Sequence, residues 1–253
     1  MKDNFSTQAN AYSKFRPDYP DEVFQYLYSH LKKFDNAWDC GTGNGQVAVK
    51  LSEKFDSVIA TDLSEKQITN AIHRPNIIYR VESAEQATFP LDHFDLITVA
   101  QAIHWFDFDV FYAIVNEVIK PNGLFAVIGY GLLKVDDTID EIIGYLYSEI
   151  LGSCWDSERR FIDENYKTIP FPFDELSVPT FVQTYHWTIE QVIGFLNTWS
   201  AVQHYQRENG ENPVEKITNQ LQSAWGVANT KSVHFPILMR VGKKERLIRH
   251  YRK

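Results

Sequence analysis

The sequence predicts a doubly wound α/β domain, in which helices cover both faces of a mostly parallel β-sheet. Three observations carry this prediction. Short apolar runs alternate with helical patterns over the first 150 residues or so, as consecutive βαβ units require. A glycine-rich turn, Gly41-Thr42-Gly43-Asn44-Gly45, follows the first apolar run, and Asp62 closes the second. After residue 135 the pattern changes to longer helical segments.

Five apolar runs in this first part are expected to be strands of the sheet. They are short and bounded by turn-forming residues, and the fourth is apolar enough to lie at the centre of the sheet. The expected strands are residues 37–40, 57–61, 77–81, 94–100 and 124–129.

Helices are expected between these strands. Val47, Leu51 and Phe55 share a helical face, and from Asp107 the apolar residues keep the i, i+3, i+4, i+7 spacing of a buried helix. The run Ser64-Glu65-Lys66-Gln67 predicts a helix that begins with a capping box. Lys120-Pro121-Asn122-Gly123 is expected to end the helix that precedes the fifth strand.

The remaining residues are expected to complete one domain that spans 1–253, with 1–135 as its core. Residues 136–230 are predicted to be mainly helical and to cover the ligand-binding face, with one sheet strand near 180–187. Within them, Thr188-Ile189-Glu190-Gln191 predicts a second capping box, and Asn212-Pro213 predicts a helix start. A final strand is expected at 232–242, followed by a basic tail at 243–253.

Composition limits the class of protein. A net charge of −8 disfavours a nucleic-acid partner, and the chain lacks the stretch of about 18 apolar residues that a membrane span needs. The two cysteines do not form a disulfide framework, and no secretory signal precedes the domain, so we expect a cytoplasmic protein. Most Trp and Tyr residues after 136 are expected in the core, and no metal site is expected because His186, His204 and His234 lack ligand spacing.

The glycine turn predicts a site for an adenosine-bearing cofactor. Glycine lets the backbone turn sharply and approach a ligand, and a carboxylate at Asp62 can accept hydrogen bonds from two ribose hydroxyls. The dinucleotide fingerprint is G-x-G-x-x-G, whereas here the third glycine comes one residue early. Asp39 would also repel a pyrophosphate and attract an ammonium group. These features favour S-adenosylmethionine, which becomes S-adenosylhomocysteine after methyl transfer, over NAD.

These residues resemble the class I S-adenosylmethionine-dependent methyltransferases. The nearest branch acts on small molecules and includes the trans-aconitate methyltransferases and the ubiquinone/menaquinone-biosynthesis-type enzymes. The resemblance covers the whole chain and is strongest over residues 5–131. The matching segments are Asp39–Gly45, Asp62-Leu63-Ser64, Ser83-Ala84-Glu85, Phe94–Ile97, Gln101–Asp107 with its His-Trp pair, Pro121–Leu124 and the N-terminal run 12–20.

The resemblance implies a Rossmann-like, seven-stranded sheet whose last strand is antiparallel. It also implies that Asp39, Gly41 and Gly43 hold the methionine part of the cofactor, that Asp62 holds the ribose, and that Gln101 lies near the sulfonium. Ala84 and Glu85 would contact the adenine. The predicted cofactor set further includes Thr42, Gly45, Leu63, Gln67, Arg16 and Tyr19.

On the acceptor side, His104 is the candidate for polarising or deprotonating the acceptor, since an imidazole can do either; alternatively it packs at the strand end. Trp105 is predicted to form the core or the floor of the substrate pocket. Tyr130 follows the fifth strand, where ligands of such sheets bind. Arg16 would bind a substrate or cofactor carboxylate, or pair with Asp18. Tyr19 would reach the cofactor carboxylate or pack beneath the N-terminal helix.

Two functions are compatible with these residues. The first is methyl transfer by in-line displacement to a small-molecule acceptor, either a carboxylate or a phenol- or quinone-like metabolite. The alternative is a regulator or degenerate methyltransferase that binds S-adenosylmethionine or S-adenosylhomocysteine without turnover. Methyl-ester formation is the narrower expectation, because of Arg16 and the His-Trp pair.

Overall fold

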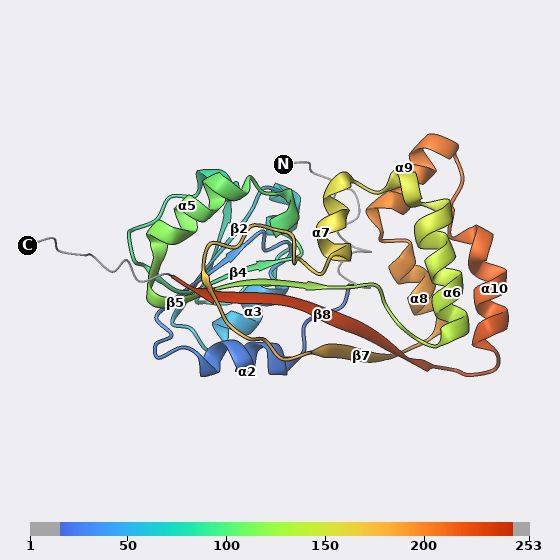
Figure 1. The fold of residues 1–253 in the computed structure, drawn as a ribbon, viewed down its shortest axis with the longest axis horizontal. Coiled ribbons are helices and arrows are strands. Elements are labelled where there is room, and N and C mark those ends of the chain that lie inside the picture. The colour runs from blue at the N-terminus through green and yellow to red at the C-terminus, as the bar shows by residue number, and fades with distance from the viewer. Residues whose placement is uncertain (1–15, 245–253) are drawn as a thin grey trace, which may run out of the picture.

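The computed structural model describes residues 16–244, so most of the predicted basic tail and residues 1–15 lie outside the described residues. Strands and helices alternate through the first half of the described chain (Figure 1). The strands there are β1 (Asn36–Cys40), β2 (Ser57–Asp62), β3 (Ile77–Val81), β4 (Phe94–Ala100) and β5 (Ile119–Tyr130). The helices there are α2 (Asp21–Ser29), α3 (Gln46–Ser52), α4 (Glu65–Thr69) and α5 (Phe108–Val118).

The second half is mostly helical between two further long strands. The helices are α6 (Asp137–Tyr145), with a π-helical turn at Leu146–Ile150, α7 (Arg160–Asp163), α8 (Ile189–Leu196), α9 (Ser200–Asn209) and α10 (Glu215–Trp225). The strands are β6 (Asp174–Glu175), β7 (Val182–Trp187) and β8 (Lys231–Lys243).

The sheet has the order β3-β2-β1-β4-β5-β8-β6, with β7 also paired to β8. Strands β1 to β5 pair with one another in parallel, and β8 runs antiparallel to β5. The predicted mostly parallel sheet with an antiparallel final strand is therefore confirmed. The two-residue β6 is an additional strand beyond the seven expected, and it pairs with the end of β8.

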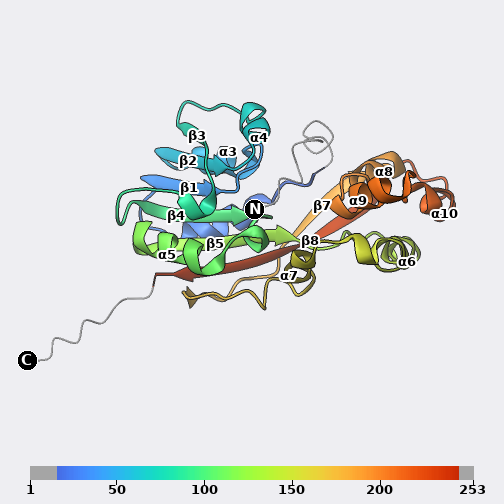
Figure 2. The same ribbon diagram turned by 90° about the horizontal axis from the view of Figure 1, so that it is seen from above.

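Alternate side chains of each strand point to opposite faces of the sheet. Helices pack against the apolar side chains on both faces. Ala37 packs in one apolar cluster with α2 and α3, whereas its neighbour Trp38 packs in a second cluster with α5. Figure 1 shows α5 above the strands and α2 and α3 below them, and Figure 2 shows the strands side by side from β3 to β8. This arrangement is the doubly wound architecture.

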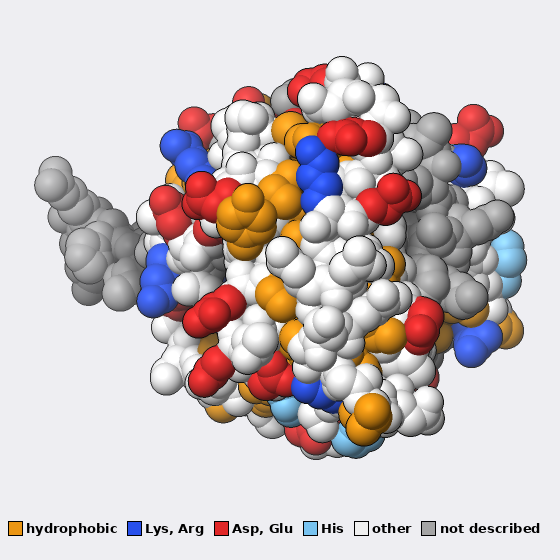
Figure 3. All heavy atoms as spheres, turned by 90° about the vertical axis from the view of Figure 1, so that its right-hand side faces the viewer, with side chains coloured by type: hydrophobic (Ala, Val, Ile, Leu, Met, Phe, Trp, Pro, Cys, Tyr) orange, Lys and Arg blue, Asp and Glu red, His pale blue; other side chains and the backbone are white. Residues whose placement is uncertain are grey.

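The strand β8 is long enough to take part in two structures. Residues 237–243 pair with β5, while residues 231–236 pair with β7 as a two-stranded ribbon beyond the sheet. Helices α6, α8, α9 and α10 lie along this ribbon (Figure 1), and α10 packs against α6 and α8. Their outer face carries scattered acidic and basic side chains with isolated apolar ones between them (Figure 3).

Several expected helix and turn features differ in detail. The box at Thr188 and Gln191 is complete, as predicted. In contrast, α10 begins after Val214, and Asn212 instead accepts a hydrogen bond from the Val214 amide at 3.0 Å. Helix α9 was not predicted. The expected turn before the fifth strand lies inside β5, where Asn122 has a φ of 68° and the pairing with β4 shifts register.

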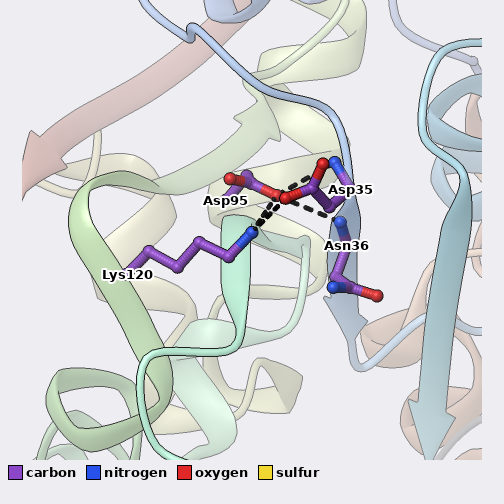
Figure 4. Close-up of polar contacts among 4 residues, drawn as sticks. All are labelled: Asp35, Asn36, Asp95 and Lys120. Carbon is purple, nitrogen blue, oxygen red and sulfur yellow. Dashed lines mark hydrogen bonds and ion pairs between the residues drawn. The ribbon is translucent and has the colours of Figure 1, made fainter.

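A buried carboxylate ties together the amino ends of three strands, opposite the end where ligands bind. Asp95 Oδ2 accepts hydrogen bonds from the amides of Asp35 and Asn36, both at 3.0 Å, and from Lys120 Nζ at 2.8 Å (Figure 4). Lys120 also pairs with Asp35 at 2.7 Å. Buried charges need such partners, so this cluster holds β1, β4 and β5 in register.

Candidate cofactor and acceptor site

The three glycines of the loop between β1 and α3 all have left-handed backbones. The φ values of Gly41, Gly43 and Gly45 are 69°, 57° and 86°. A Cβ atom on Gly41 would lie 2.5 Å from Cβ of Ala102, and one on Gly45 would lie 2.2 Å from the Tyr79 hydroxyl. A Cβ on Gly43 would meet no atom within 4 Å. Packing therefore requires Gly41 and Gly45, whereas Gly43 faces open space.

Asp39 lies behind this loop. Its side chain is buried, and its two carboxylate oxygens accept hydrogen bonds from Thr42 Oγ1 at 2.5 Å and Thr98 Oγ1 at 2.8 Å. Burial raises the pKa of Asp39 to about 6. Asp39 is not among the residues that line the cavity in front of the loop, so its predicted role in holding the methionine part of the cofactor stays a prediction. In the structure it orients the Thr42 side chain, which does line that cavity.

Asp62 joins the glycine loop to the start of α4. Its Oδ2 accepts the Gly43 amide at 2.8 Å, and its Oδ1 accepts the Ser64 amide at 2.8 Å. Ser64 Oγ caps α4 by accepting the Gln67 amide at 3.4 Å. The predicted capping box is thus only half formed, because the Ser64 amide binds Asp62 instead of the buried Gln67 side chain.

Ala84 and Glu85, the residues predicted to contact adenine, follow β3, and the predicted cofactor residue Leu63 follows β2. Leu63 is exposed beside Asp62, whereas the Ala84 side chain is buried in the core, so Ala84 can reach a ligand only through its backbone. Glu85 Oε1 accepts the Asp107 amide at 3.1 Å, which fastens the N-cap of α5. The Glu85 carboxylate therefore already has a structural partner.

A cavity in front of the glycine loop, called the loop cavity here, is lined by six of the thirteen predicted cofactor residues. Gly41, Thr42 and Gly43 form one wall, and Gln101 and Tyr130 lie at the ends of β4 and β5. The N-terminal segment closes the cavity with Arg16, Pro17 and Tyr19. Gly45 and Asp62 lie behind this lining, at the helix start and the strand end.

Two adjoining cavities, together called the helix-side cavity, extend from the loop cavity toward the helical region. Arg16 and Gln101 border all three. The helix-side cavity is further lined by His104, Trp105, Tyr130, Gly131, Leu132, Trp155, Asp156, Arg159, Ile162, Phe195, Trp199 and Ser200. Trp105 is therefore a wall of this cavity, and its predicted contact with the substrate stays a prediction.

Gln101 marks the junction of the cavities. Its φ is 53°, a left-handed value that costs a non-glycine residue about 1–3 kcal/mol. The strained conformation is held by two hydrogen bonds, from the Gln101 amide to the Ile128 carbonyl at 2.9 Å and from Nε2 to the Tyr130 carbonyl at 3.2 Å. Strain of this kind concentrates at functional sites.

Comparison with known proteins agrees with this geometry. Residues 38–127 match the family model described as a methyltransferase domain. A protein of Dictyostelium discoideum assigned as a methyltransferase is 33% identical, over 96% of this chain and 95% of its own length. A solved structure from Anaeromyxobacter dehalogenans, assigned as a type II methyltransferase, is 38% identical and covers 91% of this chain and 98% of its own, with a TM-score of 0.85.

The chain belongs to the class I S-adenosylmethionine-dependent methyltransferases. Methyltransferase cfoB of Aspergillus candidus is a more distant relative, 25% identical over 90% of this chain and 81% of its own length. The cofactor of this methyltransferase is S-adenosylmethionine, and the residues present fit it. Gly43 leaves room for a ligand to approach the backbone, and the carboxylates of Asp39 and Asp62 suit a cationic ligand that lacks phosphate.

His104 is buried beside the junction of the two cavities. Among the described residues its Nδ1 has no hydrogen-bond partner, and the buried hydroxyls of Tyr130 and Tyr166 have none either. Burial, together with the positive charges of Arg159 and Arg16, lowers the pKa of His104 to about 3. The methyltransferase therefore presents a neutral imidazole to the helix-side cavity at physiological pH.

Arg159 is the main functional candidate that sequence reasoning missed. Its Nε donates to the Tyr147 hydroxyl at 3.0 Å, and its guanidinium carbon lies 4.8 Å from the Trp155 ring centroid. Asp163 lies 3.5 Å from Arg159 Nε. Trp155 in turn packs on Trp199, with ring centroids 5.5 Å apart. These residues come from separate segments of the chain, so no local sequence motif predicts that they line one cavity.

Membrane-spanning helices and metal-binding clusters are both absent from residues 16–244. No helix in this range is long enough and apolar enough to cross a bilayer. No group of three or more His, Cys, Asp or Glu side chains in the same range is arranged to bind a metal ion.

Proposed function

We propose that this methyltransferase acts on a small carboxylic acid and forms its methyl ester. The observation that carries the proposal is that Arg16 and Arg159 border one cavity together with the buried, neutral His104. Asp156 is the one carboxylate among the residues that line this cavity, and Asp163, which pairs with Arg159, is not among them. Arginine binds carboxylates in a planar, bidentate manner, so the helix-side cavity suits an anionic acceptor.

The cofactor would lie in the loop cavity. Gly41, Thr42 and Gly43 would bind its methionine part, with the charge of Asp39 behind them attracting the ammonium group. Each Asp62 oxygen can accept a ribose hydroxyl in addition to the backbone amide that it already accepts. The adenine would lie among Leu63, Ala84 and Glu85. The buried Gln67 side chain of α4 would support these residues.

Gln101 and Tyr130 border both cavities, so they are placed where the donor and acceptor groups would meet. S-adenosylmethionine, when bound, supplies the methyl group and keeps the electron pair of the broken bond on its sulfur. An acceptor carboxylate oxygen provides the electron pair of the new bond. The chain contributes alignment and exclusion of water. The arginines would orient the acceptor, and the unpartnered Tyr130 hydroxyl would donate to it.

A carboxylate acceptor is favoured over a phenol by the state of His104. A phenol with a pKa near 10 must lose its proton before or during transfer. An imidazole whose pKa is about 3 accepts that proton poorly. A carboxylate needs no base at neutral pH. We therefore assign His104 as a neutral hydrogen-bonding partner of the acceptor, not as a general base.

The helices of residues 136–230 would act as the cover of the acceptor site. They supply Trp155, Arg159 and Trp199 to the helix-side cavity. Indole rings at this position suit an acceptor with a flat, apolar body. The acid would thus be recognised at its carboxylate by the arginines and at its body by the aromatic walls.

The test is a methyl-transfer assay with matched acceptors. Aromatic and unsaturated aliphatic monocarboxylic acids are compared with the corresponding phenols and amines, and the products are identified by mass spectrometry. We expect methyl esters, and we expect Arg159→Gln to raise the acceptor KM about tenfold or more while the Kd of S-adenosylhomocysteine stays unchanged. Methylation of phenols or amines without methylation of any acid would overturn the proposal.

A further inference from the structure

Asp18 forms a small hydrogen-bonded cluster with strand β7, far away in the sequence. The Asp18 carboxylate accepts a hydrogen bond from Gln183 Nε2 at 2.7 Å and another from the Tyr185 hydroxyl. The same hydroxyl accepts the Asp18 backbone amide at 2.9 Å. Three hydrogen bonds thus join one residue of the N-terminal segment to two alternate residues of β7. We call Asp18, Gln183 and Tyr185 the Asp18 clamp.

The β7 side of the clamp is rigid. Gln183 and Tyr185 are paired in register with Phe235 and Val233 of β8. The Tyr185 ring stacks on Trp187, with centroids 5.2 Å apart and planes at 23°. A two-stranded ribbon packed in this way offers a stable anchor for a segment that has no secondary structure of its own.

The N-terminal segment is constrained on both sides of Asp18. Pro17 and Pro20 restrict their own backbone φ angles, and Tyr19 is buried against Tyr130, with ring centroids 6.3 Å apart. The clamp therefore determines where the residue before Pro17 lies. That residue is Arg16, which borders the loop cavity and both parts of the helix-side cavity.

An exposed aspartate with three hydrogen bonds stabilises a fold only modestly, so folding alone does not account for this arrangement. We infer that Asp18, through Gln183 and Tyr185, is a positioning residue that holds Arg16 in the wall shared by the donor and acceptor cavities. The inference rests on the proposed function in that Arg16 is taken to bind an anion, either the acceptor carboxylate or that of the cofactor.

The test is a double-mutant cycle, which isolates coupling between two residues. Asp18→Ala and Tyr185→Phe are each made in the wild-type and in the Arg16→Ala background. Asp21→Ala is the matched control, since Asp21 is an exposed aspartate three residues away that pairs with Lys50 instead. Two affinities are measured: S-adenosylhomocysteine by calorimetry, and benzoate by tryptophan fluorescence of the protein loaded with S-adenosylhomocysteine.

We expect Asp18→Ala and Tyr185→Phe each to weaken benzoate binding about five- to tenfold, with the melting temperature and the control unchanged. In the Arg16→Ala background neither substitution should weaken binding further. Additive losses, or wild-type affinities for both ligands in the two clamp variants, would overturn the inference. If the wild type does not bind benzoate, this result counts against the anionic acceptor of the proposed function. The double-mutant cycle is then judged on the affinity for S-adenosylhomocysteine, because Arg16 also borders the cavity proposed for that ligand.

Discussion

The Gly43 amide donates a hydrogen bond to Asp62 Oδ2 at 2.8 Å, which joins the glycine loop to the carboxyl end of β2. A second backbone amide, that of Ser64, binds the other oxygen of the same carboxylate. Asp62 thus has two tasks. It shapes the loop that would receive the methionine part of the cofactor, and in the proposed function its carboxylate would bind the ribose.

Replacing Asp62 by alanine should weaken cofactor binding. The change removes the ribose acceptor and frees the Gly43 amide, so we expect the Kd of S-adenosylhomocysteine to rise about tenfold or more. Calorimetric titration measures this. Asp56→Ala is the control, because Asp56 is exposed at the opposite end of β2. Equal affinities for the Asp62 variant and wild type would show that this carboxylate does not hold the ribose.

Gly43→Ala should separate ligand binding from folding. A Cβ atom at Gly43 meets no protein atom within 4 Å, so its only cost to the fold is the left-handed φ, about 1–2 kcal/mol. The methyl group would instead occupy space needed by the cofactor. Gly210→Ala is a matched control, because Gly210 also has a positive φ and open space at the end of α9.

In thermal unfolding, both glycine variants should lose a similar few degrees. S-adenosylhomocysteine should raise the melting temperature of the Gly210 variant and not that of the Gly43 variant. A normal upward shift in Gly43→Ala would mean that the cofactor does not approach this part of the loop.

Asp39→Asn should change stability in a pH-dependent way. Burial raises the pKa of Asp39 to about 6, above its ordinary value of 3.8. The folded state therefore binds the proton of the Asp39 carboxyl more tightly than the unfolded state does. The stabilisation that results is complete below pH 3.8 and is lost as the pH rises through 6. The asparagine variant should thus be more stable than wild type above pH 6, by about 3 kcal/mol, with the difference vanishing below about pH 4.

Chemical denaturation at several pH values measures this difference. The same variant should bind S-adenosylmethionine more weakly at neutral pH, because the negative charge behind the glycine loop is gone. A variant that is less stable than wild type at about pH 7.5 would contradict the description of Asp39 as a buried, strained carboxylate.

His104→Gln tests the protonation state of the histidine. Because the pKa of His104 is lowered to about 3, the imidazole stays neutral between about pH 5 and pH 8. We expect His104 to add no limb to the profile of kcat/KM for an acid acceptor over this range, so that any limb near pH 6 comes from Asp39. The glutamine variant should show the same profile at a lower level. A limb centred near about pH 6.5 that disappears in the variant would identify His104 as a titrating base.

Much of the fold could be predicted because its signals are local. Each apolar run of the first half is a strand of the sheet, and the box at Thr188 and Gln191 is complete, since both are set by neighbouring residues. The helix caps that were predicted wrongly depend on which nearby group takes each backbone amide. Asp62 takes the Ser64 amide that a full capping box would have used, and Asn212 turns the chain before α10 instead of capping it.

The acceptor side was less predictable for a physical reason. The loop cavity gathers residues that stand at strand ends, which the sequence pattern reveals. The helix-side cavity depends on how separate segments of the helical region come together, and Arg159 and Trp199 stand directly before α7 and α9. Trp187, Trp199 and Trp225 are buried in the core, as expected, although Trp199 also borders the helix-side cavity. Trp155 is only partly buried against this core.

The most direct test of the account is the fate of a labelled methyl group. The purified methyltransferase is incubated with S-adenosylmethionine carrying a deuterated methyl group and with the best acid of the acceptor panel. We predict that mass spectrometry will place the label on the carboxylate oxygen, as a methyl ester, and that Arg159→Gln will abolish most of it at low acid concentration. Label found on carbon, nitrogen or a phenolic oxygen, with the carboxylate left free, would contradict the account.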